Sequence, residues 1–106
     1  MSETEIPTYL KEGREPKWSL IPGHMIGGMR RYIECGIRPG DFLTAVLSND
    51  LMEACGRADY ANRHCLFNYA TFLYNYAPRE CFGSPERVDA WIERKGLGWP
   101  VPRDDR

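Results

Sequence analysis

The sequence predicts an all-α fold, a small single-domain bundle of four to five helices with an irregular N-terminal arm. Apolar residues recur at i, i+3 and i+4 in several segments, glycine and proline mark the links between them, and no segment has a convincing strand pattern. A chain of 106 residues is one domain by size and buries one modest core. We expect an extended arm over residues 1–22, a helical domain over 23–96 and an irregular tail over 97–106.

Glycines and prolines place the first half of the helical domain. A loop carrying His24 precedes a short helix over about residues 28–35, which Gly36 ends. The next helix begins at Asp41 as its N-cap and places Leu51 and Cys55 in its apolar stripe. The run 48–50, Ser-Asn-Asp, is an alternative break that divides this helix into two pieces.

The second half of the domain has two clear helix starts. Asp59 is the N-cap of a helix over 60–76, and Ser84 followed by Pro85 starts a last helix that ends at Gly96. The arm before the domain alternates acids, bases and prolines, and we expect Trp18 to pack on its own domain.

Composition excludes some classes of partner. The net charge is −1, so the chain lacks the broad positive field expected of a protein that binds duplex DNA or an anionic membrane. Its apolar runs are only a few residues long, and its first residues are acidic and polar, which predicts no membrane span and no signal peptide. We therefore expect a cytoplasmic protein with reduced cysteines.

The segment His-Met-Ile-Gly-Gly-Met-Arg-Arg, residues 24–31, is the strongest candidate for ligand binding. Glycines at a helix start let a ligand approach free backbone N–H groups, the helix dipole favours an anion, and arginines add charge-assisted bonds. The alternative is structural: the glycines shape a turn and the arginines pair with Glu34, Asp50 or the acidic arm. The predicted ligand-binding residues of this segment are His24, Gly27, Gly28, Arg30 and Arg31.

Three residues on the next helix complete the predicted site. Asp50 lies close to the apolar stripe, so we expect a buried or interfacial carboxylate that needs a partner, with Arg57 on the same side. Asn49 is either a cap or an amide that contacts a base. The favoured interpretation of Asp50 is a structural ion pair with Arg57, or with Arg30 or Arg31 of the preceding helix, and ligand binding is the other one.

A second line of side chains runs along the helix over 60–76, opposite its core face, and contains Tyr60, His64, Phe67, Thr71 and Tyr74. The line is too aromatic for a solvated surface, which predicts a contact with the arm, another subunit or a stacked nucleobase. No catalytic residue, cofactor or metal is predicted. The adjacent His64 and Cys65 point about 100° apart on a helix, and the cysteines lack the spacing of a zinc site.

The runs GGMRRYIECGI, PGDFLTAVLSNDLMEACGRAD, FLYNYAP and GSPERVDAWIERKG, over about residues 22–96, resemble a family of small, largely uncharacterised helical proteins of tailed phages and prophages. The resemblance implies a short phage protein made in the bacterial host cytoplasm, and it carries no chemistry to transfer to single residues. Small all-α phage proteins often act against host defence.

These observations lead to one functional hypothesis and two alternatives. We expect a homo-oligomeric binding protein that sequesters a small phosphorylated nucleotide immune signal without turning it over. The first alternative is an inhibitor or adaptor that docks on a host defence protein, and the second is a phage assembly helper.

Overall fold

The computed structural model describes residues 18–99, and the predictions for residues 1–17 and 100–106 lie outside this range. All regular structure in this range is helical, which confirms the all-α class, with six α-helices in place of the expected four to five. The elements are η3 (Trp18–Leu20), α1 (Gly23–Cys35), α2 (Asp41–Leu47), α3 (Leu51–Arg57), α4 (Tyr60–Arg63), α5 (Leu66–Tyr76), η4 (Arg79–Cys81) and α6 (Pro85–Glu93), where η denotes a 3-10 turn.

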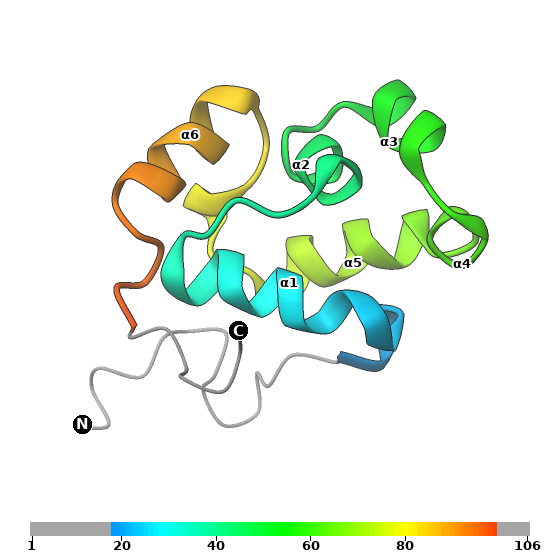
Figure 1. The fold of residues 1–106 in the computed structure, drawn as a ribbon, viewed down its shortest axis with the longest axis horizontal. Coiled ribbons are helices and arrows are strands. Elements are labelled where there is room, and N and C mark those ends of the chain that lie inside the picture. Colours follow the sequence, from blue (N-terminus) through cyan, green and yellow to red (C-terminus); the bar gives the residue numbers. More distant parts are fainter. Residues whose placement is uncertain (1–17, 100–106) are drawn as a thin grey trace.

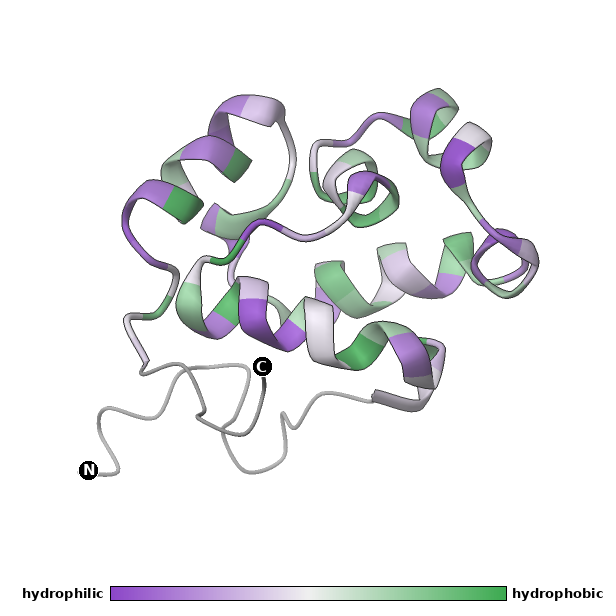
Figure 2. Cartoon of the chain, in the orientation of Figure 1, coloured by the Kyte–Doolittle hydropathy of each residue, from purple (hydrophilic) through white to green (hydrophobic). Residues whose placement is uncertain are grey.

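Hydrophobic residues recur along α2 and α5, while strongly hydrophilic residues gather on α3, α4 and the middle of α1 (Figures 1 and 2). The core holds several aromatic side chains with buried polar atoms. The Tyr32 hydroxyl donates to the Cys81 carbonyl at 2.6 Å, and the Trp91 Nε1–H donates to the Tyr32 carbonyl at 2.9 Å. These two bonds join α1, η4 and α6 around one buried ring.

Helix α1 begins five residues earlier than predicted, at Gly23, so the expected loop around His24 is the first turn of the helix. Two glycines in a helix interior each cost about 1 kcal/mol relative to alanine. The packing of Met25 and Met29 against the core explains why the helix extends through them: Met29 is fully buried and Met25 partly buried.

The predicted long helix from Asp41 is divided into α2 and α3, as the alternative break anticipated. Asn49 adopts a left-handed conformation at φ 65°, and the Asp50 carboxylate accepts the Glu53 N–H as the cap of α3. Of the two predicted environments for Asp50, buried or interfacial, the buried one is wrong, because the side chain is an exposed cap within this chain. The break also turns α3 outward, so Leu51 is exposed, contrary to expectation.

Of the three predicted N-caps, two are confirmed and one is wrong. The carboxylate of Asp59 accepts the Asn62 N–H at 2.8 Å, and the Ser84 hydroxyl accepts the Arg87 N–H at 3.1 Å. Asp41 is not a cap: Gly40 occupies the N-cap position and Asp41 lies in the first turn.

The predicted helix over 60–76 is interrupted at residues 64–65, which separates α4 from α5. The predicted core face of this helix contained Cys65, Leu66, Tyr69, Ala70, Phe72, Leu73 and Tyr76. Tyr69, Phe72 and Leu73 are buried and confirm it in part, whereas Ala70 is exposed, contrary to expectation. The phenol of Tyr69 donates to the buried Asn62 side chain at 2.7 Å, so a polar contact ties α5 to α4. Trp18 packs on the same helix, with its ring centroid 4.9 Å from that of Phe72, as expected for a contact within its own domain.

The chain after α6 docks on the end of α1. Helix α1 ends at Gly36 in a left-handed conformation, and the backbone N–H groups of Leu97 and Trp99 donate to the carbonyls of Ile33 and Glu34, at 3.1 and 3.0 Å. Carbonyl groups in the last turn of a helix lack N–H partners within the helix, and these two receive them from the chain after α6. The contact fixes the direction in which residues 37–40 leave α1.

Candidate functional site

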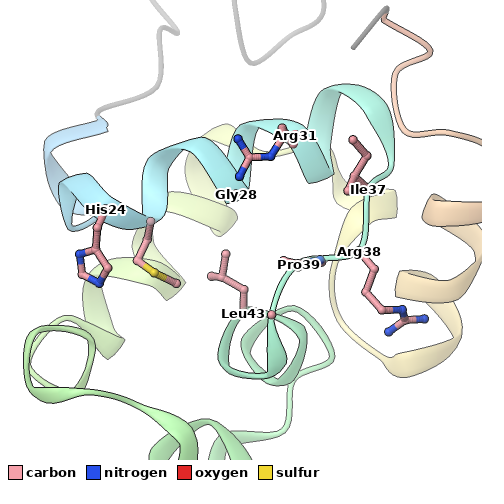
Figure 3. A pocket seen from close by; sticks show the side chains of 9 residues that line it. His24, Gly28, Arg31, Ile37, Arg38, Pro39 and Leu43 are labelled. Carbon is pink, nitrogen blue, oxygen red and sulfur yellow. The ribbon is translucent and has the colours of Figure 1, made fainter. Parts of the chain in front are cut away.

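A hollow of about 420 Å³ lies between α1, the link over residues 37–40 and the start of α2 (Figure 3). Its volume is within the range of small-molecule sites, about 300–1,000 Å³. The hollow is lined by His24, Met25, Gly28, Arg31, Ile37, Arg38, Pro39, Gly40 and Leu43.

The helical register of α1 brings three of the predicted ligand residues to this hollow. His24, Gly28 and Arg31 are spaced four and three residues apart, so they lie on one face of the helix. A Cβ atom at Gly28 would lie 3.7 Å from the Leu43 side chain, in ordinary van der Waals contact, so an alanine fits at this position.

Gly27 has a different role from the one predicted. A Cβ atom at Gly27 would lie 3.1 Å from a terminal nitrogen of Arg31, so the Arg31 side chain lies back along α1 over this glycine. The fifth residue of a helix donates its N–H within the helix. The prediction that Gly27 and Gly28 offer free N–H groups at a helix start is therefore wrong.

Ion pairs flank the hollow. At one end His24 Nε2 lies 3.2 Å from an Asp59 carboxylate oxygen, and beyond the other end Arg38 donates to Asp89 on α6 at 2.8 Å. Figure 3 shows the Arg38 guanidinium directed away from α1. The Asn62 N–H, and to a smaller extent His24, hold the pKa of Asp59 below its usual value. All four side chains are more than half exposed, so solvent screens both pairs and they add little to stability.

Arg30 faces away from the hollow. It donates from Nε to the buried Glu34 carboxylate at 3.2 Å, one turn along α1, and its guanidinium lies 6.0 Å from the centre of the Trp18 ring. The structural alternative, pairing with Glu34, is thus correct for Arg30, and its predicted role in ligand binding is not supported by its position.

Asp50 and Arg57 lie at a separate, smaller indentation of about 240 Å³ on α2 and α3. Arg57 donates to Glu53 at 2.7 Å and to Asp41 at 3.4 Å, and the hydrogen bond to Glu53 raises the pKa of Arg57. Asn49 is the left-handed residue between these helices and lines a third indentation. The eight predicted ligand residues therefore do not form one site.

The predicted aromatic line lies on the surface of α4 and α5. The exposed fractions are 74% for Tyr60, 80% for Phe67 and 82% for Tyr74, and His64 is also exposed. The rings of Tyr60 and His64 meet edge to face at 4.5 Å. None of these residues lines the hollow.

Within residues 18–99 we find no reactive cysteine cluster, metal-binding group or membrane-spanning helix. Cys35 and Cys81 are buried, Cys65 is partly buried and Cys55 is exposed, and burial raises the pKa of the Cys81 thiol to about 12. In this range no group of three or more His, Cys, Asp or Glu side chains is placed to hold a metal ion, and no helix has the length and apolar character needed to cross a bilayer.

Sequence reasoning missed Arg38 as a lining residue and Asp59 and Asp89 as the carboxylates that flank the hollow. Two features of the sequence could have pointed to Arg38: residues 30–38 are basic, and Arg38 directly precedes the Pro39-Gly40 link. Its pairing with Asp89, 51 residues away, depends on how α6 packs and has no local signature.

The fold and the hollow together define a small all-α domain with a candidate site for an anionic ligand. Comparisons of the chain with protein-family models, curated proteins and solved structures return no match. The resemblance to tailed-phage proteins therefore stays a prediction.

Proposed function

We propose that this protein binds a small phosphorylated nucleotide in the hollow beside α1 and releases it unchanged. The observation that carries the proposal is that three basic side chains, His24, Arg31 and Arg38, line one hollow of about 420 Å³, with Arg31 along the α1 wall. Arginine presents a planar set of donors that matches a phosphate group.

The apolar residues that line the hollow suit the nucleoside part of a phosphorylated nucleotide. Met25, Ile37 and Leu43 supply apolar surface next to Arg31, and Gly28 leaves room between the helix and Leu43. Small-molecule sites combine a mostly apolar wall with a few placed polar groups. A nucleoside phosphate has a flat apolar base and a charged end, and both find a counterpart here.

The two flanking ion pairs do not prevent anion binding. Because His24 and Arg38 pair with exposed aspartates, a phosphate can take the place of either carboxylate at little cost. A dianion in place of Asp59 or Asp89 then keeps a charge-assisted hydrogen bond on the same basic side chain.

The resemblance to small phage proteins extends the proposal to a biological role. A phage protein in the bacterial cytoplasm that holds a nucleotide without consuming it lowers the concentration of that nucleotide for host receptors. We therefore propose sequestration of a phosphorylated nucleotide signal of host defence. The alternative, an inhibitor of a host defence protein, would use the exposed aromatic line instead of the hollow.

Isothermal titration with cyclic nucleotides and with ADP-ribose derivatives tests the proposal, and chromatography of the recovered ligand tests for turnover. Arg31→Ala should weaken binding about tenfold or more, since the loss of one charge-assisted bond costs about 1.5–3 kcal/mol and 1.4 kcal/mol is tenfold. Arg57→Ala removes the same charge from the separate indentation and should leave binding unchanged.

A second pair of variants changes space without changing charge. Gly28→Leu should fill the hollow and abolish binding, whereas Gly28→Ala meets only an ordinary contact with Leu43 and should retain it. Absence of binding for all these nucleotides at micromolar concentrations, or equal affinity of the Gly28→Leu and Gly28→Ala variants, would contradict the proposal.

A further inference from the structure

We infer that the exposed face of α5 is an interface between two copies of this chain, which pair antiparallel about a twofold axis midway between Ala70 and Thr71. The inference does not rest on the proposed ligand, because no residue of α5 lines the hollow. It concerns the part of the predicted aromatic line that lies on one continuous helix, Leu66–Tyr76.

The first observation is an apolar face without a cover among the described residues. Phe67 and Tyr74 are 80% and 82% exposed, while Tyr69, Phe72 and Leu73 on the opposite face are buried. The two exposed residues are seven positions apart, so they lie on the same side of the helix, roughly 10 Å apart along its axis. Exposed aromatic pairs of this kind are typical of protein interfaces.

The second observation is the symmetry of this face. The midpoint between Phe67 and Tyr74 along the helix falls between two small residues, Ala70 and Thr71. When two copies of α5 pair antiparallel about this midpoint, Phe67 of each copy lies opposite Tyr74 of the other. The two small residues lie at the crossing, where they allow the helices to approach closely. An isologous interface requires this self-complementarity.

The third observation is charge. Helix α5 contains no Asp, Glu, Lys or Arg from Leu66 to Tyr76. A twofold interface brings identical groups near the axis, where like charges would repel each other. A surface that recognises a charged partner needs complementary charge, and α5 offers none. The absence of charge from this helix favours a second copy of the chain over a different, charged protein.

An indentation next to the exposed face of α5 gives the second copy a place to dock. It has a volume of about 120 Å³ and a largely apolar lining that includes Leu51, Leu66 and Ala70, with Asn49 and Asp50 as its polar residues. Since Tyr74 of the second copy lies level with Phe67, it also lies next to this indentation. The exposed Leu51 extends the apolar surface beyond α5.

The exposed apolar area of α5 indicates how tightly two copies should associate. An aromatic side chain buries about 150–250 Å² when fully covered, so Phe67 and Tyr74 together contribute roughly 300 Å² per copy. A standard interface buries about 800 Å² per partner. The two rings are thus the centre of a modest interface, and we expect a dimer that dissociates at micromolar concentrations.

Sedimentation velocity of the full chain between about 1 and 200 μM measures the dimer directly. We expect a species of twice the 12.2 kDa mass of the chain at the upper concentrations. Phe67→Asp and Tyr74→Asp should each weaken the dimer at least tenfold. Ile37→Asp, which introduces the same charge at an exposed apolar side chain outside α5, should leave it unchanged.

Disulfide trapping tests the antiparallel geometry. In a Cys55→Ser, Cys65→Ser background, Thr71→Cys places a thiol near the axis and should form a disulfide between copies on mild oxidation. Asn75→Cys should not, because its two copies lie roughly 13 Å apart along the helices, beyond the Cα separation of about 4.4–6.8 Å that a disulfide spans. The background without a new cysteine is the control.

Three results would overturn the inference. A chain that remains monomeric at 200 μM would mean that this face is covered by residues 1–17 of the same chain or by a different protein. A dimer that both aspartate variants retain would use another surface. Efficient trapping at position 75 with none at position 71 would exclude the antiparallel pairing.

Discussion

Replacing the buried Gly96 with alanine should destabilise the protein strongly. Gly96 lies at φ 60° just after α6, and its backbone meets the end of α1. A Cβ atom there would lie 2.6 Å from the Gly36 nitrogen and 2.6 Å from the Ile33 carbonyl oxygen. Both neighbours are backbone atoms, so a change of rotamer cannot relieve the overlap.

The cost has two parts. An alanine held in the left-handed region loses about 1–2 kcal/mol relative to glycine, and overpacking a closely packed site costs about 1–3 kcal/mol. The expected loss for Gly96→Ala is therefore about 2–5 kcal/mol, a large share of the about 5–15 kcal/mol that stabilises a typical domain. Gly36→Ala should lose a similar amount, because its Cβ would lie 2.6 Å from the Gly96 nitrogen.

Two other glycines separate these contributions. Gly98 has φ 82°, and a Cβ atom added to it would have no neighbour within 4 Å, so Gly98→Ala should show only the conformational cost of about 1–2 kcal/mol. Gly56 lies in the exposed helix α3, also with open space around it, and Gly56→Ala should stabilise the protein by about 0.5–1 kcal/mol.

Thermal and urea unfolding followed by circular dichroism at 222 nm measure all four variants. A loss of 1 kcal/mol lowers the Tm of a domain of this size by about 4–8 °C, so Gly96→Ala should melt about 10 °C or more below the natural chain. If Gly96→Ala proved no less stable than Gly98→Ala, the close approach of the two helix ends would be refuted.

Three further predictions concern the core. Tyr32→Phe leaves the buried Cys81 carbonyl without its 2.6 Å donor and should cost about 1–3 kcal/mol in urea unfolding, while Tyr74→Phe on the surface should change stability by less than about 0.5 kcal/mol. Burial raises the pKa of Tyr32 and Tyr69 above the ordinary value of 10.0, so the folded state keeps protons that the unfolded state releases. Stability should hold below pH 10 and fall above it by roughly 1.4 kcal/mol per pH unit for each tyrosine, and equal stability at pH 10 and 11 would contradict this. In thiol labelling with peptide mapping, exposed Cys55 should react in the folded protein and Cys81 only on unfolding; equal rates would show that Cys81 is accessible.

The fold class and most helix positions were predictable, because they depend on spacing and on caps that act within three residues. Asp59 and Ser84 cap helices by bonds to the third residue beyond them, and both are evident in the sequence. Helix lengths were less predictable. The break at Asn49 has a local signal, Ser-Asn-Asp, and was predicted as an alternative, whereas the interruption at residues 64–65 was not predicted from the periodicity.

The candidate site was only partly predictable, because its composition depends on where α1 begins. If residues 24–28 formed a loop, the sequence would not determine which side of α1 His24 faces. Arg30 and Arg31 would then be equally good candidates for the same site. In a helix that begins at Gly23, Arg31 shares a face with His24 and Arg30 faces Trp18. A shift of five residues in one helix start thus decides which arginine faces the hollow.

The hollow and the contact between the helix ends are physically linked. Gly36 directs the chain from α1 into residues 37–40, which form one wall of the hollow, and Gly96 holds Gly36 in place from the other side. A ligand bound against this wall stabilises only the folded state, so it should raise the Tm of the natural chain in proportion to the logarithm of its concentration. If α1 and its following link were displaced by Gly96→Ala, the same ligand should bind more weakly, although Gly96 itself does not line the hollow. Equal affinity in a destabilised but folded Gly96→Ala variant would show that the wall keeps its position without this contact.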